Sequence, residues 1–308
     1  MVTTIVSVDL DDIGCYHAIH GLAAPAPNTE GVVLERCLPR FLELFAETGV
    51  LATFFVIGRD LARDRSTKGT GSAILQCAAR SGHELANHSY AHAYDLVRGT
   101  PTQIFDDLRR CDGELRAIGS VPVGFRAPGY THSTSMLKQV AALGYRYDSS
   151  LLPAPAYYFA RLGAIAMKKL RGRTSASQAR GLSSFVGSTR AKILPDIGLW
   201  EVPISVSRRL RLPLVGTFLL GAPAPVAAVL REQAATQSYV HLQFHGIDLC
   251  DPEIDGIDAK LIKRQPELRH SLKRRQSWIK EILRARGGAT TIASGFTVGA
   301  TAAARIDD

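Results

Sequence analysis

The chain has 308 residues, of which 46% are hydrophobic, enough for a sizeable buried core and too many for a disordered protein. No run of 18 uncharged apolar residues occurs, so no transmembrane helix is predicted, and the N-terminus is typical of a first strand, not of a signal peptide. The formal charge of +9 suits an anionic partner such as nucleic acid, an anionic membrane or a phosphorylated substrate, or else marks a basic surface without a specific partner.

The five cysteines are scattered and form no C-x-x-C pair; they are Cys15, Cys37, Cys77, Cys111 and Cys250. An odd, scattered set is typical of free thiols in a reducing compartment. We therefore expect a cytoplasmic protein. The sequence contains no internal repeat and no evident linker, so residues 1–308 are predicted to form one domain.

Strands and helices alternate along the chain. Apolar runs predict strands within the first 14 residues, ending in Ser7–Asp12, near residues 51–58, in a short stretch leading into Asn87-His88, and near 121–130, 145–150, 198–205, 239–245 and 289–294. Helical spacing predicts helices near 33–48, ending at Gly49, and near 70–81, 101–118, 133–143, 223–236 and 266–286. This βα alternation, with units of about 40 residues, predicts a parallel α/β architecture.

The alternation is interrupted at residues 153–195. This segment combines tyrosines and aliphatic residues with Lys168, Lys169, Arg171 and Arg173, and it ends in a Ser-rich stretch. We predict an insertion that contains a basic amphipathic helix. Together with the apolar stretch 212–220, it is expected to form a lid over the substrate or a rim facing an anionic membrane, with an ordinary solvated surface helix as the alternative.

Polar residues follow the predicted strands where each one ends. Asp9, Asp11, His88, Arg126 and Asp148 all occupy such positions. The carboxyl ends of barrel strands are where barrel active sites form. Asp9 and Asp11 are two residues apart and point the same way while the strand persists, although aspartates in this position also cap helices and form turns.

A histidine pair provides the second part of the candidate site. On a helical turn, the i, i+4 spacing of His88 and His92 would place both imidazoles on one face. With Asp11 they would make an open set of two histidines and one carboxylate, which suits hydrolysis more than structure. Asp9 would then be free to act as a base, and His245 could donate a proton from the opposite side.

Five short motifs resemble those of the metal-dependent polysaccharide deacetylases, the NodB-homology carbohydrate esterases. In chain order they are Val8-Asp9-Leu-Asp11-Asp12, His88-Ser-Tyr-Ala-His92, Arg126-Ala-Pro128-Gly129-Tyr130, Asp148-Ser149 and Leu242-Gln-Phe-His245. Each motif alone is weak, but five in fixed order over residues 5–246 are specific. The insertion and the C-terminal tail lie outside the resemblance.

The resemblance implies a distorted (β/α)7 barrel and a divalent metal. Zinc is expected first, with Co²⁺, Ni²⁺, Mn²⁺ or Fe²⁺ as alternatives. The implied metal ligands are Asp11, His88 and His92. Asp9 would take a proton from the attacking water, and Arg126 would keep Asp9 ionised by charge pairing.

The resemblance also implies an oxyanion site, formed by the metal and a backbone N–H near Gly129 or Tyr130. His245 would protonate the leaving amine. Trp200, in the strand after the insertion, is predicted to contact the substrate. The remaining histidines are expected to contact substrate or cap turns (His17, His20 and His132) or to be structural (His83, His241 and His270).

Two departures from the family pattern leave alternatives open. Asp9-x-Asp11 replaces the usual adjacent aspartates, so Asp12 competes with the assigned base and ligand. The fourth motif lacks its usual Asp-Trp continuation, and either Asp148 or Glu201 could orient His245.

The function expected from this resemblance is removal of an N-acetyl or N-formyl group from an amino sugar. The alternatives are hydrolysis of a lipid-linked or non-sugar amide, and an inactive deacetylase-like binding protein. An acylated amino-sugar substrate is the expected partner, with peripheral contact to an anionic membrane as a further option. Nucleic acid is not expected, because the basic residues do not surround aromatic stacking positions.

Overall fold

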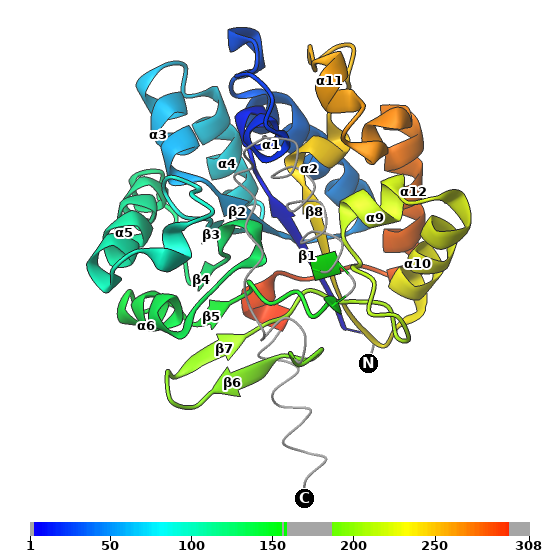
Figure 1. Cartoon of the computed structure of the whole chain (residues 1–308). Coiled ribbons are helices and arrows are strands. Elements are labelled where there is room, and N and C mark those ends of the chain that lie inside the picture. The colour runs from blue at the N-terminus through cyan, green and yellow to red at the C-terminus, as the bar shows by residue number, and fades with distance from the viewer. Residues whose placement is uncertain (1–2, 156, 159–186, 296–308) are drawn as a thin grey trace, which may run out of the picture.

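The strands form one curled, eight-stranded sheet, an open and distorted (β/α) barrel (Figure 1). The computed structural model describes residues 3–155, 157–158 and 187–295. The spatial order of the strands is β6-β7-β5-β4-β3-β2-β1-β8. Seven run parallel: β1 (Thr3–Asp9), β2 (Thr53–Val56), β3 (Glu84–Asn87), β4 (Gly124–Phe125), β5 (Tyr147–Asp148), β7 (Leu199–Glu201) and β8 (Tyr239–His245). β6 (Lys192–Leu194) pairs antiparallel with β7. The predicted (β/α)7 barrel is confirmed.

Irregular chain closes the barrel between β7 and β8. The Ser205 N–H donates to the His241 carbonyl (3.0 Å), and its hydroxyl accepts from the His241 N–H (2.8 Å). Farther along, Val215 makes an isolated parallel bridge with Gln243. These contacts satisfy the free edge of β8 without a further strand.

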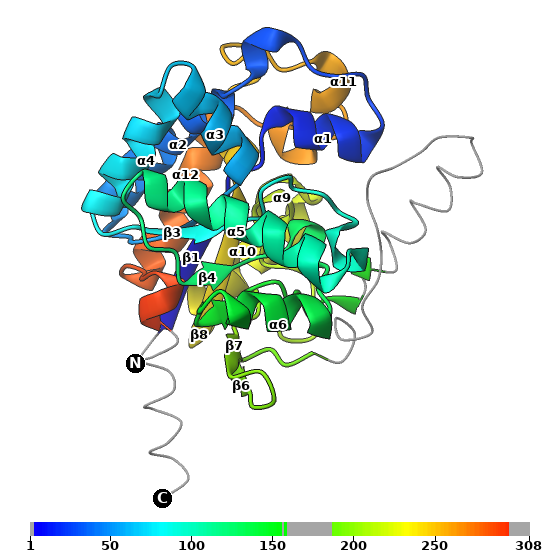
Figure 2. The same cartoon turned by 90° about the vertical axis from the view of Figure 1, so that its left-hand side faces the viewer.

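Helices cover the outside of the sheet (Figures 1 and 2). They are α1 (Ile13–His20), α2 (Leu38–Thr48), α3 (Gly58–Ser66), α4 (Thr70–Arg80), α5 (Pro101–Ala117), α6 (Thr134–Ala142), α9 (Gly216–Gly221), α10 (Ala224–Thr236), α11 (Ala259–Ile262) and α12 (Leu272–Arg286). A π-helical turn, η2 (Val33–Cys37), precedes α2, and 3₁₀ turns are η1 (Pro27–Thr29), η3 (Leu96–Arg98), η4 (Pro128–Tyr130), η5 (Gly246–Leu249) and η6 (Pro266–Arg269). Gly49 ends α2 in the left-handed conformation, as predicted.

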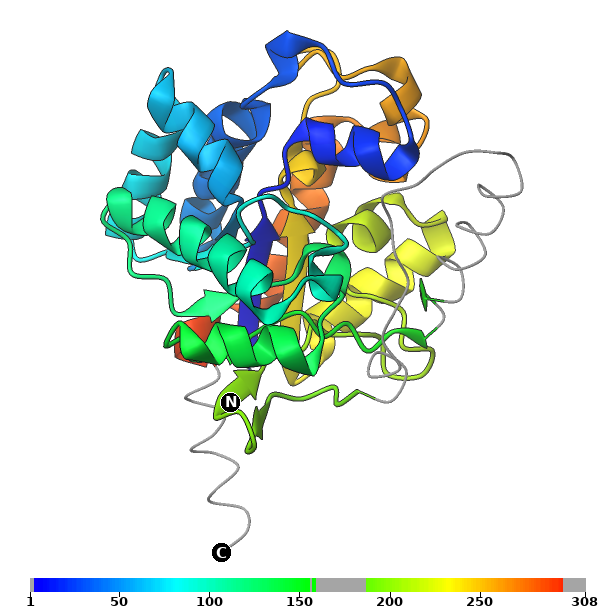
Figure 3. The ribbon, with the colours of Figure 1, turned by 60° about the vertical axis from the view of Figure 1, so that its left-hand side comes forward.

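Alternation along β1 and β8 separates an outer apolar core from the barrel interior. Val6 and Val8 pack outward in the main core, with Val240, Leu242 and Phe244 of β8. The residues between them face inward. The lower interior is apolar and contains Ile5, Phe55, Tyr147, Val202 and Ile292. The polar residues of β1 and β8 lie nearer the carboxyl ends of the strands, where α1 crosses above them (Figure 3).

The predicted last strand, 289–294, is wrong. Thr290 and Ala289 make only isolated bridges, with Ile5 and Val50. The chain then crosses the amino-terminal end of the barrel, where the Ile292 N–H donates to the Thr53 hydroxyl (2.8 Å). Ile292 is fully buried there and plugs the interior. The helices α1, α3, α9 and α11 were not predicted, because they are short or weakly amphipathic.

The stretch 212–220 is not an exposed lid or membrane rim, and this part of the prediction is wrong. Leu214, Leu219 and Leu220 are buried in the main core. Gly216 starts α9 so close to Asp248 that a Cβ on it would lie 1.7 Å from a carboxylate oxygen. The apolar residues of this stretch therefore stabilise the fold. In the predicted insertion, residues 156 and 159–186, including all four basic residues named above, lie outside the described part of the chain.

Among the helices of the described segments, none is both long and apolar enough to cross a membrane. All five cysteines lie in those segments and are free thiols, as the sequence predicts.

Candidate active site

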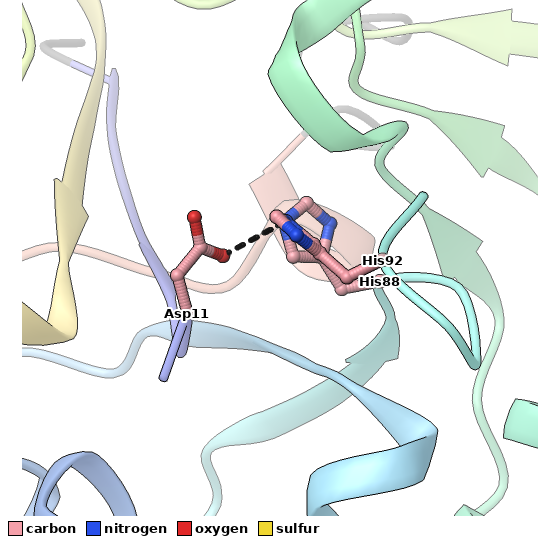
Figure 4. A group of neighbouring side chains, drawn as sticks. All are labelled: Asp11, His88 and His92. Atoms are coloured by element: carbon pink, nitrogen blue, oxygen red, sulfur yellow. Dashed lines mark ion pairs between the residues drawn. The ribbon is translucent and has the colours of Figure 1, made fainter. Parts of the chain in front are cut away.

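Asp11, His88 and His92 converge just beyond the ends of β1 and β3 (Figure 4). Asp11 Oδ1 lies 3.2 Å from His88 Nε2 and 3.3 Å from His92 Nε2. All three side chains are almost completely buried. The predicted ligand set is therefore one spatial cluster.

The two histidines do not lie on a helical turn, contrary to the local structure predicted for them. Residues 88–92 form a tight loop in which Ser89 and His92 have positive φ angles of 64° and 51°. The Ser89 hydroxyl accepts from the His92 N–H (2.8 Å), and Asn87 Oδ1 accepts from the Ser89 N–H (2.8 Å). This loop turns both imidazoles toward Asp11, with their ring centres 4.8 Å apart.

The protonation pattern of this cluster fits a divalent cation. His88 Nδ1 lies 2.8 Å from the Arg126 carbonyl, so it carries the proton and leaves the lone pair of Nε2 facing Asp11 in the neutral ring. Asp11 Oδ1 and His92 Nε2 are buried and make no hydrogen bond with any residue that the structure describes. A carboxylate and two imidazole nitrogens are ligands that zinc and similar metals accept.

The electrostatics of the cluster favour positive charge beside Asp11. Burial raises the pKa of the Asp11 carboxyl, but both imidazoles lower it, and the net pKa lies well below the ordinary value. Burial lowers the pKa of His88, but the Asp11 and Asp9 carboxylates raise it, and the net pKa lies above the ordinary value. A bound cation would supply the positive charge that protonated histidines otherwise provide.

Asp9 is held beside this cluster by two donors. Arg126 Nη1 donates to Asp9 Oδ1 (2.5 Å), and Gln243 Nε2 donates to Asp9 Oδ2 (3.1 Å). Asp9 Oδ2 also lies 4.0 Å from His88 Nε2. Asp9 is therefore a buried carboxylate with its charge compensated and one edge turned toward the predicted ligands.

Arg126 connects the candidate base to the ligand set. Its guanidinium is fully buried and also donates to the Ser149 carbonyl and hydroxyl (both 2.9 Å), while its carbonyl holds His88. His241 completes its surroundings: Nδ1 donates to the Pro203 carbonyl (3.1 Å), and Nε2 lies 3.3 Å from Arg126 Nη2. Burial and the Arg126 charge hold the pKa of His241 well below its ordinary value, which suits the predicted structural role.

A chain of hydrogen bonds links Asp9 to His245, and its direction is fixed. Gln243 Nε2 faces the Asp9 carboxylate and lies 2.8 Å from the Phe244 carbonyl oxygen. Both of these groups can only accept, so this end of the amide must be the NH₂ donor, and Oε1 at its other end must accept. The Tyr130 hydroxyl donates to that oxygen (3.0 Å). Burial, and next the Asp9 charge, raise the pKa of Tyr130 well above its ordinary value, so the phenol keeps its proton. The Tyr130 oxygen therefore accepts from His245 Nε2–H at 3.1 Å.

Asp12 does not belong to the ligand cluster. Its side chain accepts from the Ile13 N–H (2.9 Å), capping α1, and pairs with Arg63 Nη2 (2.7 Å). This geometry supports the assignment of Asp9 and Asp11 as the functional pair.

The predicted orienting role of Asp148 or Glu201 does not fit the structure. Both are buried, and with His132 they form a separate cluster. Asp148 accepts from the Ser150 hydroxyl and N–H (2.7 and 3.0 Å), while Glu201 accepts from the Leu151 N–H (3.2 Å). Within the described chain neither pairs with His245. These acids shape the loop that presents Ser149 to Arg126.

The carboxylate that contacts His245 is Asp248, whose Oδ2 accepts from the His245 main-chain N–H (2.8 Å). Sequence reasoning gave no role to Asp248 or Gln243. A signal for Gln243 was present, since His241, Gln243 and His245 alternate on β8 and must share its inward face.

Two predicted substrate contacts need correction. Trp200 packs against the apolar cluster of Ile5 and Ile292 in the lower interior. The Tyr130 N–H donates to the Ala127 carbonyl (3.1 Å) within η4, so it is engaged and not directed at an oxyanion. Gly129 precedes it with a φ of 63°.

A cavity of about 610 Å³ opens beside His92. Its walls come from α1, the following loop, the start of α3 and residues 91–95; they include Cys15, His17, Arg59, Tyr94 and Asp95. Sequence reasoning considered only His17 among these residues as a substrate contact. Of the three clustered residues, His92 lines the cavity, whose volume has room for a sugar-sized group.

The parallel barrel carries its buried carboxylate–histidine cluster just beyond the carboxyl ends of its strands, where the active sites of α/β barrels form. Residues 30–147 match the family model of the polysaccharide deacetylases.

Curated relatives match over part of their length. The chitooligosaccharide deacetylase of Bradyrhizobium sp. (strain ANU 289) is 31% identical over 94 residues, covering 30% of this chain and 39% of that protein. The peptidoglycan deacetylase-like protein FGM2 of Gibberella zeae is 28% identical over 156 residues, covering 49% and 44%. The chain thus spans less than half of each of these relatives.

Solved structures share the fold. A Mycobacterium smegmatis protein named as a polysaccharide deacetylase aligns with 98% of this chain and 91% of its own, with a TM-score of 0.60 and 18% identity. The 4-alpha-glucanotransferase of Thermococcus litoralis aligns with 96% of this chain and 40% of its own, with a TM-score of 0.57 and 11% identity. Function must therefore be argued from the site.

Proposed function

We propose that this protein is a metal-dependent hydrolase that removes an N-acetyl or N-formyl group from an amino sugar. The observation that carries the proposal is the convergence of Asp11, His88 and His92 beside an Asp9 carboxylate that Arg126 and Gln243 hold. The match of residues 30–147 to the polysaccharide deacetylase family supports hydrolysis of an acetylated sugar. The three clustered residues would hold the cation, with zinc preferred.

The chain's own residues account for both proton transfers. A bound divalent cation supplies Lewis acidity toward the amide. Asp9 accepts a proton from the water whose oxygen adds to the acyl carbon. His245, as the general acid, gives a proton to the nitrogen as the carbon–nitrogen bond breaks, so the products are a carboxylic acid and a free amine. Arg126 and Gln243 hold the Asp9 carboxylate in position, and Tyr130 orients His245.

The substrate class follows from the cavity and the relatives. The cavity beside His92 offers polar groups from Arg59, Asp95 and Tyr94, which suit hydroxyl-rich ligands. The relatives' names refer to chitooligosaccharide and peptidoglycan, so an N-acetylated glucosamine unit is the first candidate. A formylated or lipid-linked amino sugar is the alternative.

Release of acetate and formate should be measured with metal-loaded protein and a panel of N-acetylated and N-formylated amino sugars, as monomers, oligomers and lipid-linked forms. Zinc, cobalt, nickel, manganese and iron should be compared on each. Release from one class, abolished in Asp9→Asn, supports the proposal. Binding without release from any substrate would indicate an inactive deacetylase-like binding protein.

A further inference from the structure

A second, polar pocket lies at the opposite end of the barrel from the candidate active site. It has a volume of about 300 Å³ and is lined by Thr189, Arg190, residues 205–208, Arg211 and residues 237–239. Tyr239 begins β8 and His245 ends it, so six residues, or about 20 Å, separate the pocket from the site. This pocket is therefore independent of the proposed catalysis.

The loop that carries two of its arginines is tightly built. The Ser207 N–H donates to the Leu212 carbonyl (2.8 Å), the Leu212 N–H donates to the Ser207 hydroxyl (2.9 Å), and the Arg211 N–H donates to the Ser207 carbonyl (3.1 Å). Gln237 Nε2 ties the loop to the start of β8 through the Val206 carbonyl (3.3 Å). Arg211 has a φ of 48°, a strained value for a residue with a side chain, which the loop enforces.

The charges in this pocket are uncompensated. Arg190, Arg208 and Arg211 line it, and in the described part of the chain no carboxylate lies within ion-pairing distance of any of them. Elsewhere, Arg40 and Arg63 pair closely with Asp255 and Asp12. Three guanidinium groups around one concavity repel one another unless an anion lies between them.

The pocket also offers neutral hydrogen-bond donors. Thr189 lines it beside the arginines, and Tyr239 does so with a buried hydroxyl that has no hydrogen-bond partner among the described residues. Guanidinium forks match the oxygens of phosphate better than any other side chain, and hydroxyl donors supplement them.

We infer that this arginine pocket binds a phosphoryl group, in the form of free phosphate, a phosphate ester or the head group of an anionic lipid. The three arginines neutralise the charge, and the rigid 205–211 loop fixes the spacing of Arg208 and Arg211. The overall charge of +9 favours the approach of such an anion.

Titration calorimetry with inorganic phosphate, at constant low ionic strength set with chloride, tests the inference. The intact protein should bind phosphate saturably, and Arg208→Gln/Arg211→Gln should weaken this at least about tenfold. The matched control Arg80→Gln/Arg284→Gln removes the same charge from two exposed arginines on α4 and α12 and should change it less than about twofold. No saturable binding, or equal weakening in both double variants, would overturn the inference.

Vesicle flotation identifies the source of the phosphoryl group. A lipid head group would be supported if the protein floats with phosphatidylglycerol vesicles but not with phosphatidylcholine vesicles. Free phosphate should then suppress this flotation, and Arg208→Gln/Arg211→Gln should abolish it. Phosphate binding without flotation would support a soluble phosphate or phosphate ester. Metal content, measured in parallel, should be the same in all variants, so failure here is distinguishable from failure of the proposed hydrolase function.

Discussion

His245 Nε2 lies 3.1 Å from the hydroxyl of Tyr130, and the hydrogen bond between them runs from the imidazole to the phenol. The direction is set at the other end of this series of hydrogen bonds. Gln243 donates to Asp9, so its side-chain oxygen accepts from the Tyr130 hydroxyl. The proposed base and the proposed acid therefore share one ordered network. In this protein a phenol orients the acid where the family pattern led us to expect a carboxylate.

Removing that phenol should slow turnover without releasing the metal. Tyr130→Phe loses a hydrogen bond to His245 but keeps the ring, so kcat should fall about tenfold, since a buried polar group left unpaired costs roughly 1–3 kcal/mol. KM should stay nearly constant, because the phenol acts through His245. Steady-state kinetics and metal analysis check this. Tyr157→Phe is the control, since its hydroxyl makes no hydrogen bond with the described chain; an equal loss of kcat there would contradict the role of Tyr130.

The metal should depend on both histidines. His88→Ala and His92→Ala each remove one of the three proposed ligands, so the purified variants should retain little or no metal by elemental analysis. Asp12→Asn should retain it, because Asp12 caps α1 and pairs with Arg63 outside the cluster. Full occupancy in both histidine variants would refute the ligand assignment.

Asp9→Asn should separate catalysis from metal binding. The change removes a base but keeps the size of the side chain, so kcat should fall by roughly 10²- to 10⁴-fold. Metal content should be unchanged, because Asp9 lies beside the cluster and not in it. If Asp12→Asn rather than Asp9→Asn abolished turnover, the base would have to be reassigned.

Stability should fall as the pH rises because of Glu267. This carboxyl is fully buried, and both of its oxygens lack a hydrogen-bond partner among the described residues. Burial, and next the Asp248 charge, raise its pKa to about 8. The pKa of this carboxyl is about 4.3 in the unfolded state and about 8 in the folded state, so between these pH values only the folded state keeps the proton. Each pH unit in this window therefore lowers the free energy of unfolding by about 1.4 kcal/mol, and the loss levels off above pH 8.

Glu267→Gln should remove this dependence. Urea unfolding of the intact protein and the variant at pH 5, 6.5 and 8 measures the difference in free energy of unfolding. The free energy of unfolding of the variant should increase relative to that of the intact protein as the pH rises. A difference that does not change with pH would show that Glu267 is ionised in the folded state.

Gly216 should be intolerant of a side chain. A Cβ there would meet the Asp248 carboxylate, so Gly216→Ala should destabilise the protein by about 1–3 kcal/mol. Gly113, inside α5, has nothing within 4 Å of its added Cβ, and Gly113→Ala should stabilise by about 0.5–1 kcal/mol. Thermal and urea unfolding compare the two. A neutral Gly216→Ala would mean that α9 does not pack on Asp248.

The sequence alone determined the features that depend on local periodicity. Alternating strand and helix patterns predicted the parallel α/β architecture, and the resemblance to a known family implied the barrel. The polar residues that end the strands predicted that Asp9, Asp11, His88 and Arg126 would meet at one end. These predictions succeeded because the carboxyl ends of parallel strands must lie together, whatever the intervening chain does.

Only the tertiary structure decided which residues contact each side chain of the candidate site. Asp148 matches a family motif, yet it faces Glu201 and Ser150, while Tyr130 and Asp248 are the groups that contact His245. The apolar stretch 212–220 could have covered a surface or filled the core, and composition cannot separate these cases. Such choices depend on which segments the barrel brings together, as with Tyr130 and His245, which are 115 positions apart. Contacts of this kind leave no periodic signal in the chain.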